Sequence, residues 1–175
     1  MKTHTLTAEV WLPISRETVF GYFSDARNLE ALTPPWLRFA VLTPEPILMR
    51  AETLIDYRLR VHGLPLRWQS EITVWLPPLR FVDEQLHGPY RRWIHTHTFE
   101  ERGGGTLCRD FVEYAVPGGS FINWLLVRRD LERIFAYRHR FLETIFRSGQ
   151  AEHPSGSPLT CAAPPPLSEK FPPTR

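Results

Sequence analysis

Residues 120–146, near the C-terminal end of the chain, read SFINWLLVRRDLERIFAYRHRFLETIF. The large apolar residues of this segment recur at steps of three and four, which is typical of one face of an amphipathic helix. Pro117-Gly118-Gly119 precedes the segment, and Ser120 is a suitable N-cap. A helix of about 27 residues spans roughly 40 Å, enough to cross a whole sheet. We therefore predict one long helix with an apolar stripe of Trp124, Val127, Leu131, Ile134, Phe141 and Ile145, widened by Leu125, Phe135, Leu142 and Phe146.

Upstream of this helix the sequence has the pattern of a sheet. Residues 5–12 alternate apolar and polar side chains, as a half-buried strand does. Ser15 can begin a short helix and Ser24 or Asp25 a second one, which Pro34-Pro35 ends. From residue 37 to residue 114, turn sequences rich in Gly and Pro recur about every dozen residues, which predicts six further strands in a meander. One face of these strands is apolar, formed by Ile55, Tyr57, Leu59 and Val61 and by Trp68, Ile72, Val74 and Leu76.

The chain length of 175 residues fits one domain, and hydrophobic residues, at 42%, supply a full core. We assign residues 1–147 to this domain. Residues 148–175 hold seven of the seventeen prolines, together with Ser and Gly, and are predicted to be a disordered tail.

Composition also argues against several classes of protein. The net charge is +2 and the Lys and Arg residues are scattered, which does not favour a nucleic-acid partner. Two cysteines, Cys108 and Cys161, form neither a disulfide framework nor metal-ligand spacing, which suits a cytoplasmic protein. The N-terminal residues lack the apolar stretch of a secretory signal, and no run of about 18 apolar residues predicts a membrane span. No stable membrane insertion is expected, and the oligomeric state stays open.

The order strand, two short helices, six strands and long helix resembles the START/Bet v 1-like (SRPBCC) superfamily over about residues 5–146, and within it a group of bacterial ligand-binding SRPBCC proteins. The resemblance implies an α+β helix-grip fold, in which a curved antiparallel seven-stranded sheet wraps around the C-terminal helix. Superfamily members bind lipids, sterols, polyketides and plant hormones in an internal cavity, and some are cyclases or dehydratases. The motifs that carry the resemblance are Leu32-Thr33-Pro34-Pro35-Trp36-Leu37, Phe81-Val82-Asp83-Glu84-Gln85 followed by Gly88-Pro89, Trp93-Ile94-His95-Thr96-His97-Thr98-Phe99, and Gly105-Thr106 with Asp110 and Tyr114.

A polar patch is predicted inside the apolar face of the sheet. Because side chains alternate along a strand, Trp93, His95 and His97 share one face, which should look inward. The hairpin at residues 103–105 places Asp110 beside His95 or His97. The turn at residues 87–90 likewise brings Asp83 and Gln85 near His95 and Trp93. Each buried polar group without a partner costs on the order of 1 to 3 kcal/mol, so the presence of His and Asp on an inward face requires an explanation.

Three interpretations of this patch are open. It is a His–Asp network that satisfies itself and braces the sheet, or a cavity lining that orients the polar end of a ligand, or a site of chemistry. The chemistry would be acid–base catalysis by a His that Asp110 orients, or a metal held by His95, His97 and either Asp83 or Asp110. We predict non-enzymatic binding of a small hydrophobic molecule without a metal or cofactor. A polyketide cyclase/dehydratase-like enzyme that uses the same cavity is the alternative.

Two further residues are candidates for the ligand site. Arg138 interrupts the apolar stripe of the long helix, so it either reaches the rim, which we favour, or projects into the cavity to pair with a ligand carboxylate or Asp83. If the helix is rotated, Tyr137 or His139 points inward instead. Trp36 follows two prolines and either hangs over the cavity mouth or fills the core.

The arginines of the long helix, with Trp124 as an anchor, would also suit a helix that lies on a membrane surface. That interpretation is the weaker one, because the wide apolar face is needed to cover the sheet.

Overall fold

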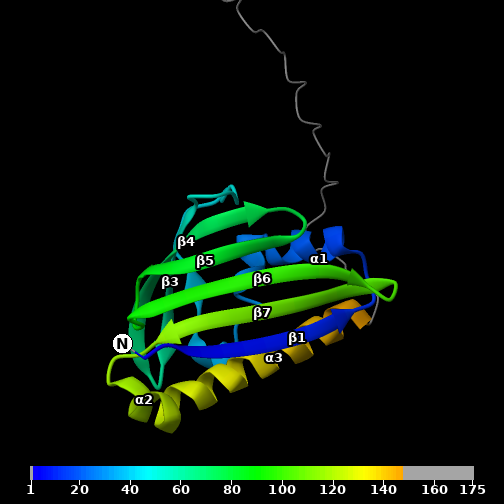
Figure 1. Ribbon diagram of the computed structural model, residues 1–175. Coiled ribbons are helices and arrows are strands. Elements are labelled where there is room, and N and C mark those ends of the chain that lie inside the picture. The colour runs from blue at the N-terminus through cyan, green and yellow to red at the C-terminus, as the bar shows by residue number, and fades with distance from the viewer. Residues whose placement is uncertain (1, 148–175) are drawn as a thin grey trace, which may run out of the picture.

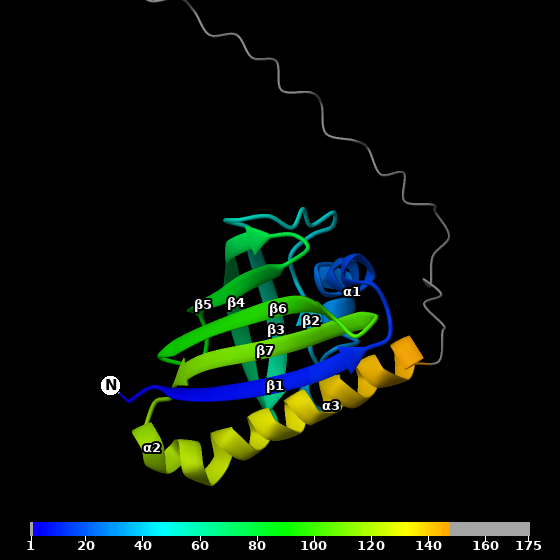
Figure 2. The same ribbon diagram turned by 45° about the vertical axis from the view of Figure 1, so that its right-hand side comes forward.

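Seven antiparallel strands form one curved sheet, and a long C-terminal helix runs along its concave side (Figures 1 and 2). The computed structural model describes residues 2–147. The strand order is β1-β7-β6-β5-β4-β3-β2. The strands are β1 (His4–Leu12), β2 (Ala40–Val41), β3 (Leu54–Val61), β4 (Leu64–Leu76), β5 (Arg80–His87), β6 (Arg92–Arg102) and β7 (Gly105–Ala115). The predicted helix-grip architecture is confirmed. The predicted tail and Cys161 lie outside the described residues.

Two short helical elements, α1 and η1, follow β1, as predicted, and a third, η2, comes before β2. Helix α1 (Arg16–Phe23) begins at Ser15, whose Oγ accepts from the backbone N–H of Thr18. The 3-10 turn η1 (Ala26–Leu29) begins at Asp25, whose side chain accepts from the backbone N–H of Arg27. A second 3-10 turn, η2 (Pro35–Leu37), opens at the prolines. Together these elements close one side of the space between sheet and long helix.

The long helix is continuous but not uniform, and this changes which residues it buries. It begins as α2 (Gly119–Ile122), passes through a π-helical segment, η3 (Asn123–Val127), and continues as α3 (Arg128–Arg147). A π segment places more residues in each turn than an α-helix does and so rotates the apolar stripe. The inclusion of Trp124 and Leu125 in the buried stripe is therefore wrong: they are 67% and 42% exposed. The stripe packs on the sheet from Leu131 onward, with Phe135, Leu142 and Phe146 also buried.

A bulge in β4 corrects a second prediction. Ile72 pairs with Asp83 and Val74 with Val82, so Thr73 is an extra residue opposite β5. A bulge exchanges the faces of the residues that follow it. Trp75 therefore packs toward the core against Phe20 and Phe81, while Leu76, predicted to face inward, is 47% exposed.

The β6–β7 hairpin sets the register that matters for the polar patch. Gly103 and Gly104 both have positive φ, 58° and 77°, as the two central residues of a tight hairpin turn require. The turn pairs His97 with Asp110 on neighbouring strands, and the β5–β6 pairing places Asp83 opposite His95. Both neighbour relations agree with the prediction.

Within residues 2–147, no helix combines the length and the hydrophobicity needed to cross a membrane.

Candidate functional site

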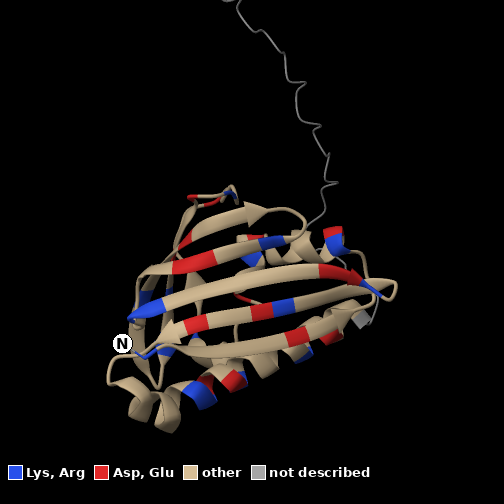
Figure 3. Cartoon of the chain, viewed as in Figure 1, with Lys and Arg blue, Asp and Glu red and all other residues tan. Residues whose placement is uncertain are grey.

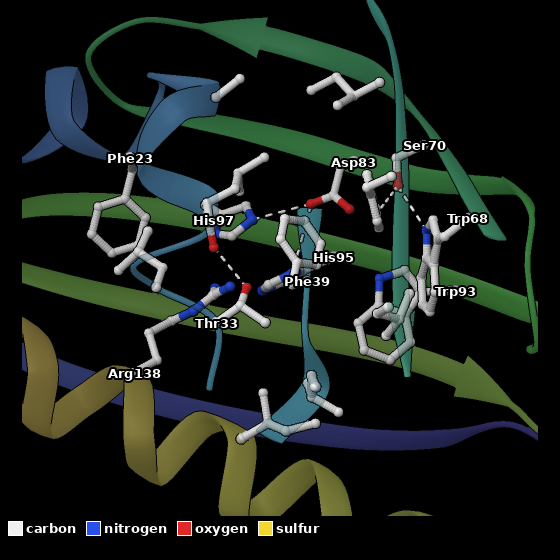
Figure 4. A pocket seen from close by; sticks show the side chains of 18 of the residues that line it. Phe23, Thr33, Phe39, Trp68, Ser70, Asp83, Trp93, His95, His97 and Arg138 are labelled. Carbon is white, nitrogen blue, oxygen red and sulfur yellow. Dashed lines mark hydrogen bonds and ion pairs between the residues drawn. The ribbon is translucent and has the colours of Figure 1, made fainter. Parts of the chain in front are cut away.

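A cavity of about 180 Å³ lies between the concave face of the sheet and α3 (Figure 4). The short helical elements close it with apolar residues such as Phe23, Leu32 and Leu37. Strands β3 to β6 supply the opposite wall, which includes Trp68 and Trp93. The polar lining comes from Asp83, His95 and His97 on the sheet, Arg138 on the helix, and Ser70 and Tyr57 beyond them. The cavity is thus mostly apolar, with one charged wall.

Two imidazoles and two carboxylates make up the core of that wall. His95 Nε2 donates to Asp110 Oδ1 at 3.0 Å, and His97 Nε2 donates to Asp83 Oδ2 at 3.1 Å. The remaining ring nitrogens also face carboxylates, with His95 Nδ1 3.6 Å from Asp83 Oδ2 and His97 Nδ1 2.8 Å from Asp110 Oδ1. The second of these contacts lacks hydrogen-bond geometry. The two rings lie 3.8 Å apart, so the four side chains form one compact network.

Burial and mutual contact push the pKa values of the two histidines in opposite directions. Burial lowers the pKa of His95, and the neighbouring His97 lowers it further. Burial also lowers the pKa of His97, but its contacts with Asp110 and Asp83 outweigh burial, so the pKa of His97 is raised. Of the two rings, His97 therefore holds a second proton more readily than His95 does.

Both carboxylates stay ionised in this setting. Burial raises the pKa of Asp110, but the contacts with His95 and His97 and the charge of Arg138 hold it well below its usual value. The pKa of Asp83 is lowered in the same way, chiefly by its hydrogen bond to His97 against the effect of burial. The two carboxylates thus face the guanidinium of Arg138 and the imidazole of His97, whose pKa is raised.

Arg138 points into the cavity. Its side chain is 14% exposed, its guanidinium carbon lies 5.4 Å from the centre of the Phe135 ring, and Nη1 is 3.7 Å from Asp110 Oδ1. Figure 4 shows it reaching from α3 toward Thr33 and the imidazoles. The placement at the rim is therefore wrong, because Phe135 and Asp110 provide an inward partner for the guanidinium. Its Nε and Nη1 atoms are buried and make no hydrogen bond within the described residues.

The other predicted site residues separate into two groups. Trp93 lines the cavity, whereas Gln85 and Asp110 do not border it. The Gln85 amide donates to the Tyr90 carbonyl at 2.7 Å and its oxygen accepts from the Tyr90 N–H, so Gln85 braces the β5–β6 turn. Asp110 lies behind the imidazoles and acts through them.

Trp36 is not a core residue, since it is 55% exposed. Its indole meets the Tyr137 ring edge-on at 5.8 Å and borders a second hollow of about 440 Å³. Val61, Leu37, Pro89, Tyr90 and Ile134 line both this hollow and the cavity. The hollow and the cavity therefore share a wall, and Trp36 lines the hollow but not the cavity.

A pair of hydroxyl groups on β3 and β4 completes the polar lining of the cavity. The sequence pattern did not predict this pair. Tyr57 Oη lies 2.7 Å from Ser70 Oγ, which also accepts from Trp68 Nε1 at 3.0 Å. Burial, followed by the charge of Asp83, raises the pKa of Tyr57 well above its usual value. The sequence feature that could have predicted this pair is Ser70, a polar residue that shares a face of β4 with the inward-facing Trp68 and Ile72.

Asp83, His95 and His97 could together hold a metal ion, since one ligand atom from each lies within 4.8 Å of the others. In the structure His97 Nε2 already donates to Asp83 Oδ2, and His95 Nε2 donates to Asp110 Oδ1. A cation would have to displace those hydrogen bonds and would sit close to the positive charge of Arg138, which opposes it. The absence of a metal stays a prediction.

Residues 12–139 match the family model described as polyketide cyclase / dehydrase and lipid transport. The chain belongs to this family. A search of curated proteins gives no match.

Among solved structures, protein TTHA0849 from Thermus thermophilus is similar, with a TM-score of 0.67 and 20% identity over 85% of this chain and 100% of that one. The Zhui aromatase/cyclase from Streptomyces sp. R1128 has a TM-score of 0.67 at 12% identity, covering 86% and 98%. A nucleoside-diphosphate sugar epimerase from Corynebacterium glutamicum is 26% identical with a TM-score of 0.57, covering 81% of this chain and 29% of that one. The resemblance to the START/Bet v 1-like superfamily is thereby confirmed.

Proposed function

We propose that the protein binds a small, mostly aromatic or aliphatic molecule in the cavity between sheet and α3, with an acidic or hydrogen-bond-accepting end directed at Arg138. The observation that carries the proposal is that two buried guanidinium nitrogens of Arg138, Nε and Nη1, have no hydrogen-bond partner within residues 2–147. Buried donors without an acceptor are costly, and a ligand oxygen would remove that cost. The apolar lining would supply most of the affinity.

The size of the cavity limits the ligand. An apolar cavity of about 150 Å³ holds benzene, so about 180 Å³ suits a substituted ring, and the adjoining hollow suits a longer group. Burying about 300 Å² of apolar ligand surface corresponds to roughly 7 kcal/mol before association costs. Hydrogen bonds to Arg138 would add about 1.5–3 kcal/mol and association would subtract at least about 4 kcal/mol, so affinities in the micromolar to millimolar range are expected.

The test compares two probes and two variants. A naphthoate and its neutral carboxamide are titrated into the wild type, Arg138→Gln and Arg140→Gln, whose arginine is exposed on the same helix. Arg138→Gln should weaken naphthoate binding about tenfold to a hundredfold, because a hydrogen bond to a charged group contributes about 1.5–3 kcal/mol. Carboxamide binding should change much less, and Arg140→Gln should change neither. Equal affinities of both probes for wild type and Arg138→Gln would contradict the proposal.

An enzyme of the cyclase or dehydratase type is the second candidate, because the two neighbouring imidazoles have pKa values shifted apart, as an acid and a base require. Against it, each ring nitrogen faces a carboxylate instead of the cavity. Catalysis would need one nitrogen to leave its carboxylate and reach the substrate. Turnover of a polyketide-like substrate that His97→Gln abolishes while binding persists would favour the enzyme over the binding protein.

A further inference from the structure

Four large apolar side chains are exposed together at the start of the long helix. Phe121, Trp124, Leu125 and Leu126 are 66%, 67%, 42% and 45% exposed, and the Phe121 and Trp124 rings lie 6.4 Å apart. We name these four residues the α2 patch. Within residues 2–147 nothing packs over them, because the π segment turns the apolar face away from the sheet. Contiguous exposed apolar residues of this size mark interaction surfaces.

Arginines border the α2 patch. Arg128, Arg129 and Arg133 follow on the next turns of the helix, and all three are exposed. Two acidic residues share this stretch, but Glu132 is paired with Arg128 and Asp130 with His62. Arg129 and Arg133 therefore keep their charges unopposed by any acidic partner within the described chain.

A second pair of arginines lies at the same end of the molecule. Arg91 and Arg92 are exposed at the start of β6, and the backbone N–H of Arg91 donates to the carbonyl of Ala115, just before the helix begins. Figures 1 and 3 show α2 and the start of β6 at one end of the molecule, with basic residues at the start of β6 and, alongside acidic ones, on the first turns of α3 that follow α2. Positive charge is thus gathered here, although the whole chain carries only +2.

The α2 patch also adjoins the second hollow. Ile122 and Val127, from the same turns of helix, line that hollow together with Arg133 and Trp36. The hollow shares a wall with the cavity. A flat apolar partner that covers the α2 patch would therefore meet the outer end of the cavity.

We propose that this end of the protein docks reversibly on an anionic lipid surface. Exposed aromatic and leucine side chains enter the region between headgroups and acyl chains, and neighbouring arginines bind lipid phosphates. The unopposed arginines favour a negatively charged surface over an apolar patch of another protein. The docking proposal does not depend on the ligand proposed above. Docking would, however, place the cavity where a molecule dissolved in lipid can enter it.

The test is sedimentation of the full-length protein with vesicles. Wild type should bind vesicles of phosphatidylcholine mixed with phosphatidylglycerol, bind phosphatidylcholine alone much less, and lose binding as salt is raised. Trp124→Ser should weaken binding at least about fivefold, and Arg129→Gln about fivefold. The matched controls are Leu79→Ser and Arg80→Gln, whose residues are exposed at the β4–β5 turn, far from α2 (Figure 1). Both controls should bind like the wild type.

Two results would overturn the proposal. One is equal binding by the α2 variants and the controls, or no binding to anionic vesicles. The other is a dimer in analytical ultracentrifugation that Trp124→Ser dissociates, without vesicle binding, because the α2 patch would then be an interface between copies of the chain. Naphthoate titration without vesicles reports on the cavity separately, so a failed docking test leaves the proposed function unaffected.

Discussion

At the scale of single residues, the central fact is that four buried ionisable side chains, Asp83, His95, His97 and Asp110, pair with one another through two hydrogen bonds and further close contacts. His97 lies between two carboxylates and stacks on Phe81, with ring centres 4.2 Å apart. His95 occupies the equivalent place next to it with the opposite protonation preference. Toward the cavity, Arg138 presents Nε and Nη1 without a hydrogen-bond partner within residues 2–147. We therefore propose that the network braces the sheet while Arg138 orients the ligand.

The pH dependence of stability follows from the raised pKa of His97. A histidine whose pKa is higher in the folded state contributes stability that is fully present below its unfolded value of about 6.5 and is lost as pH rises through the folded value. We expect His97→Gln to destabilise the protein more at about pH 6 than at about pH 9. Urea unfolding of both proteins at the two pH values measures this. A loss that grows with pH would mean that the pKa of His97 is lowered.

At the scale of elements, the sheet and α3 are held together by the apolar face that α3 turns toward the sheet. Leu131 is 3% exposed and packs with Val112, Tyr114 and Phe135, whereas Arg129, two residues earlier, is exposed. The helix pattern is reliable from Leu131 onward because these side chains interlock with strand residues. Before Leu131 the π segment breaks the period.

We predict that Leu131→Asp unfolds the protein while Arg129→Asp does not. A carboxylate without a partner in the core costs several kcal/mol, which is comparable to the whole stability of a domain. Circular dichroism and thermal melting of both variants test this. Similar melting of the two variants would show that the face of α3 turned to the sheet has been misidentified.

A comparison of two glycines distinguishes the effect of backbone conformation from the effect of available space. An added Cβ meets nothing within 4 Å at Gly104 or at Gly21, but Gly104 has a φ of 77° and Gly21 lies inside α1. Gly104→Ala should therefore destabilise the protein by about 1–2 kcal/mol, and Gly21→Ala should stabilise it by roughly 0.4–1 kcal/mol. Denaturant midpoints measure both changes. The same sign for both variants would refute the explanation by backbone conformation.

At the scale of the whole molecule, the sheet, the short helices and α3 enclose the cavity. The predicted domain ends at residue 147, directly after the last apolar residue of the helix stripe, Phe146. Strands far apart in the chain meet here: β1 pairs with β7, which returns to lie between β1 and β6. The sheet is therefore complete only when the last strand, β7, has paired with β1 and β6, and the cavity is enclosed only when α3 packs on the sheet.

Residues 148–175 are predicted to be dispensable for this domain, because their composition offers too little apolar surface to offset the entropy of ordering. A protein that ends at Arg147 should melt within about 5 °C of the full chain, a shift that corresponds to roughly 1.5 kcal/mol in a domain of this size. A thermal melt of both forms decides it. A larger drop would place the tail within the folded unit.

Local sequence patterns were enough to predict the elements and the neighbours of His97. Period-two and helical patterns predicted seven strands and a long helix, and the two glycines with positive φ set the β6–β7 pairing that brings His97 beside Asp110. These features depend on local backbone preferences and on the alternation of side chains, which a single segment carries within itself.

The inward position of Arg138, the exposure of Trp124 and the face of Trp75 emerged only from the packed molecule. The exposure of Trp124 depends on the π segment in the long helix and the face of Trp75 on the bulge in β4. Arg138 turns inward because Phe135 and Asp110 provide its partners there. The pairing of the charged groups is likewise tertiary, because Arg138, Asp110 and His95 come from different elements and meet only when helix and sheet pack. Charge and hydrogen-bond energies act between such groups in space, so no pattern within one segment contains them.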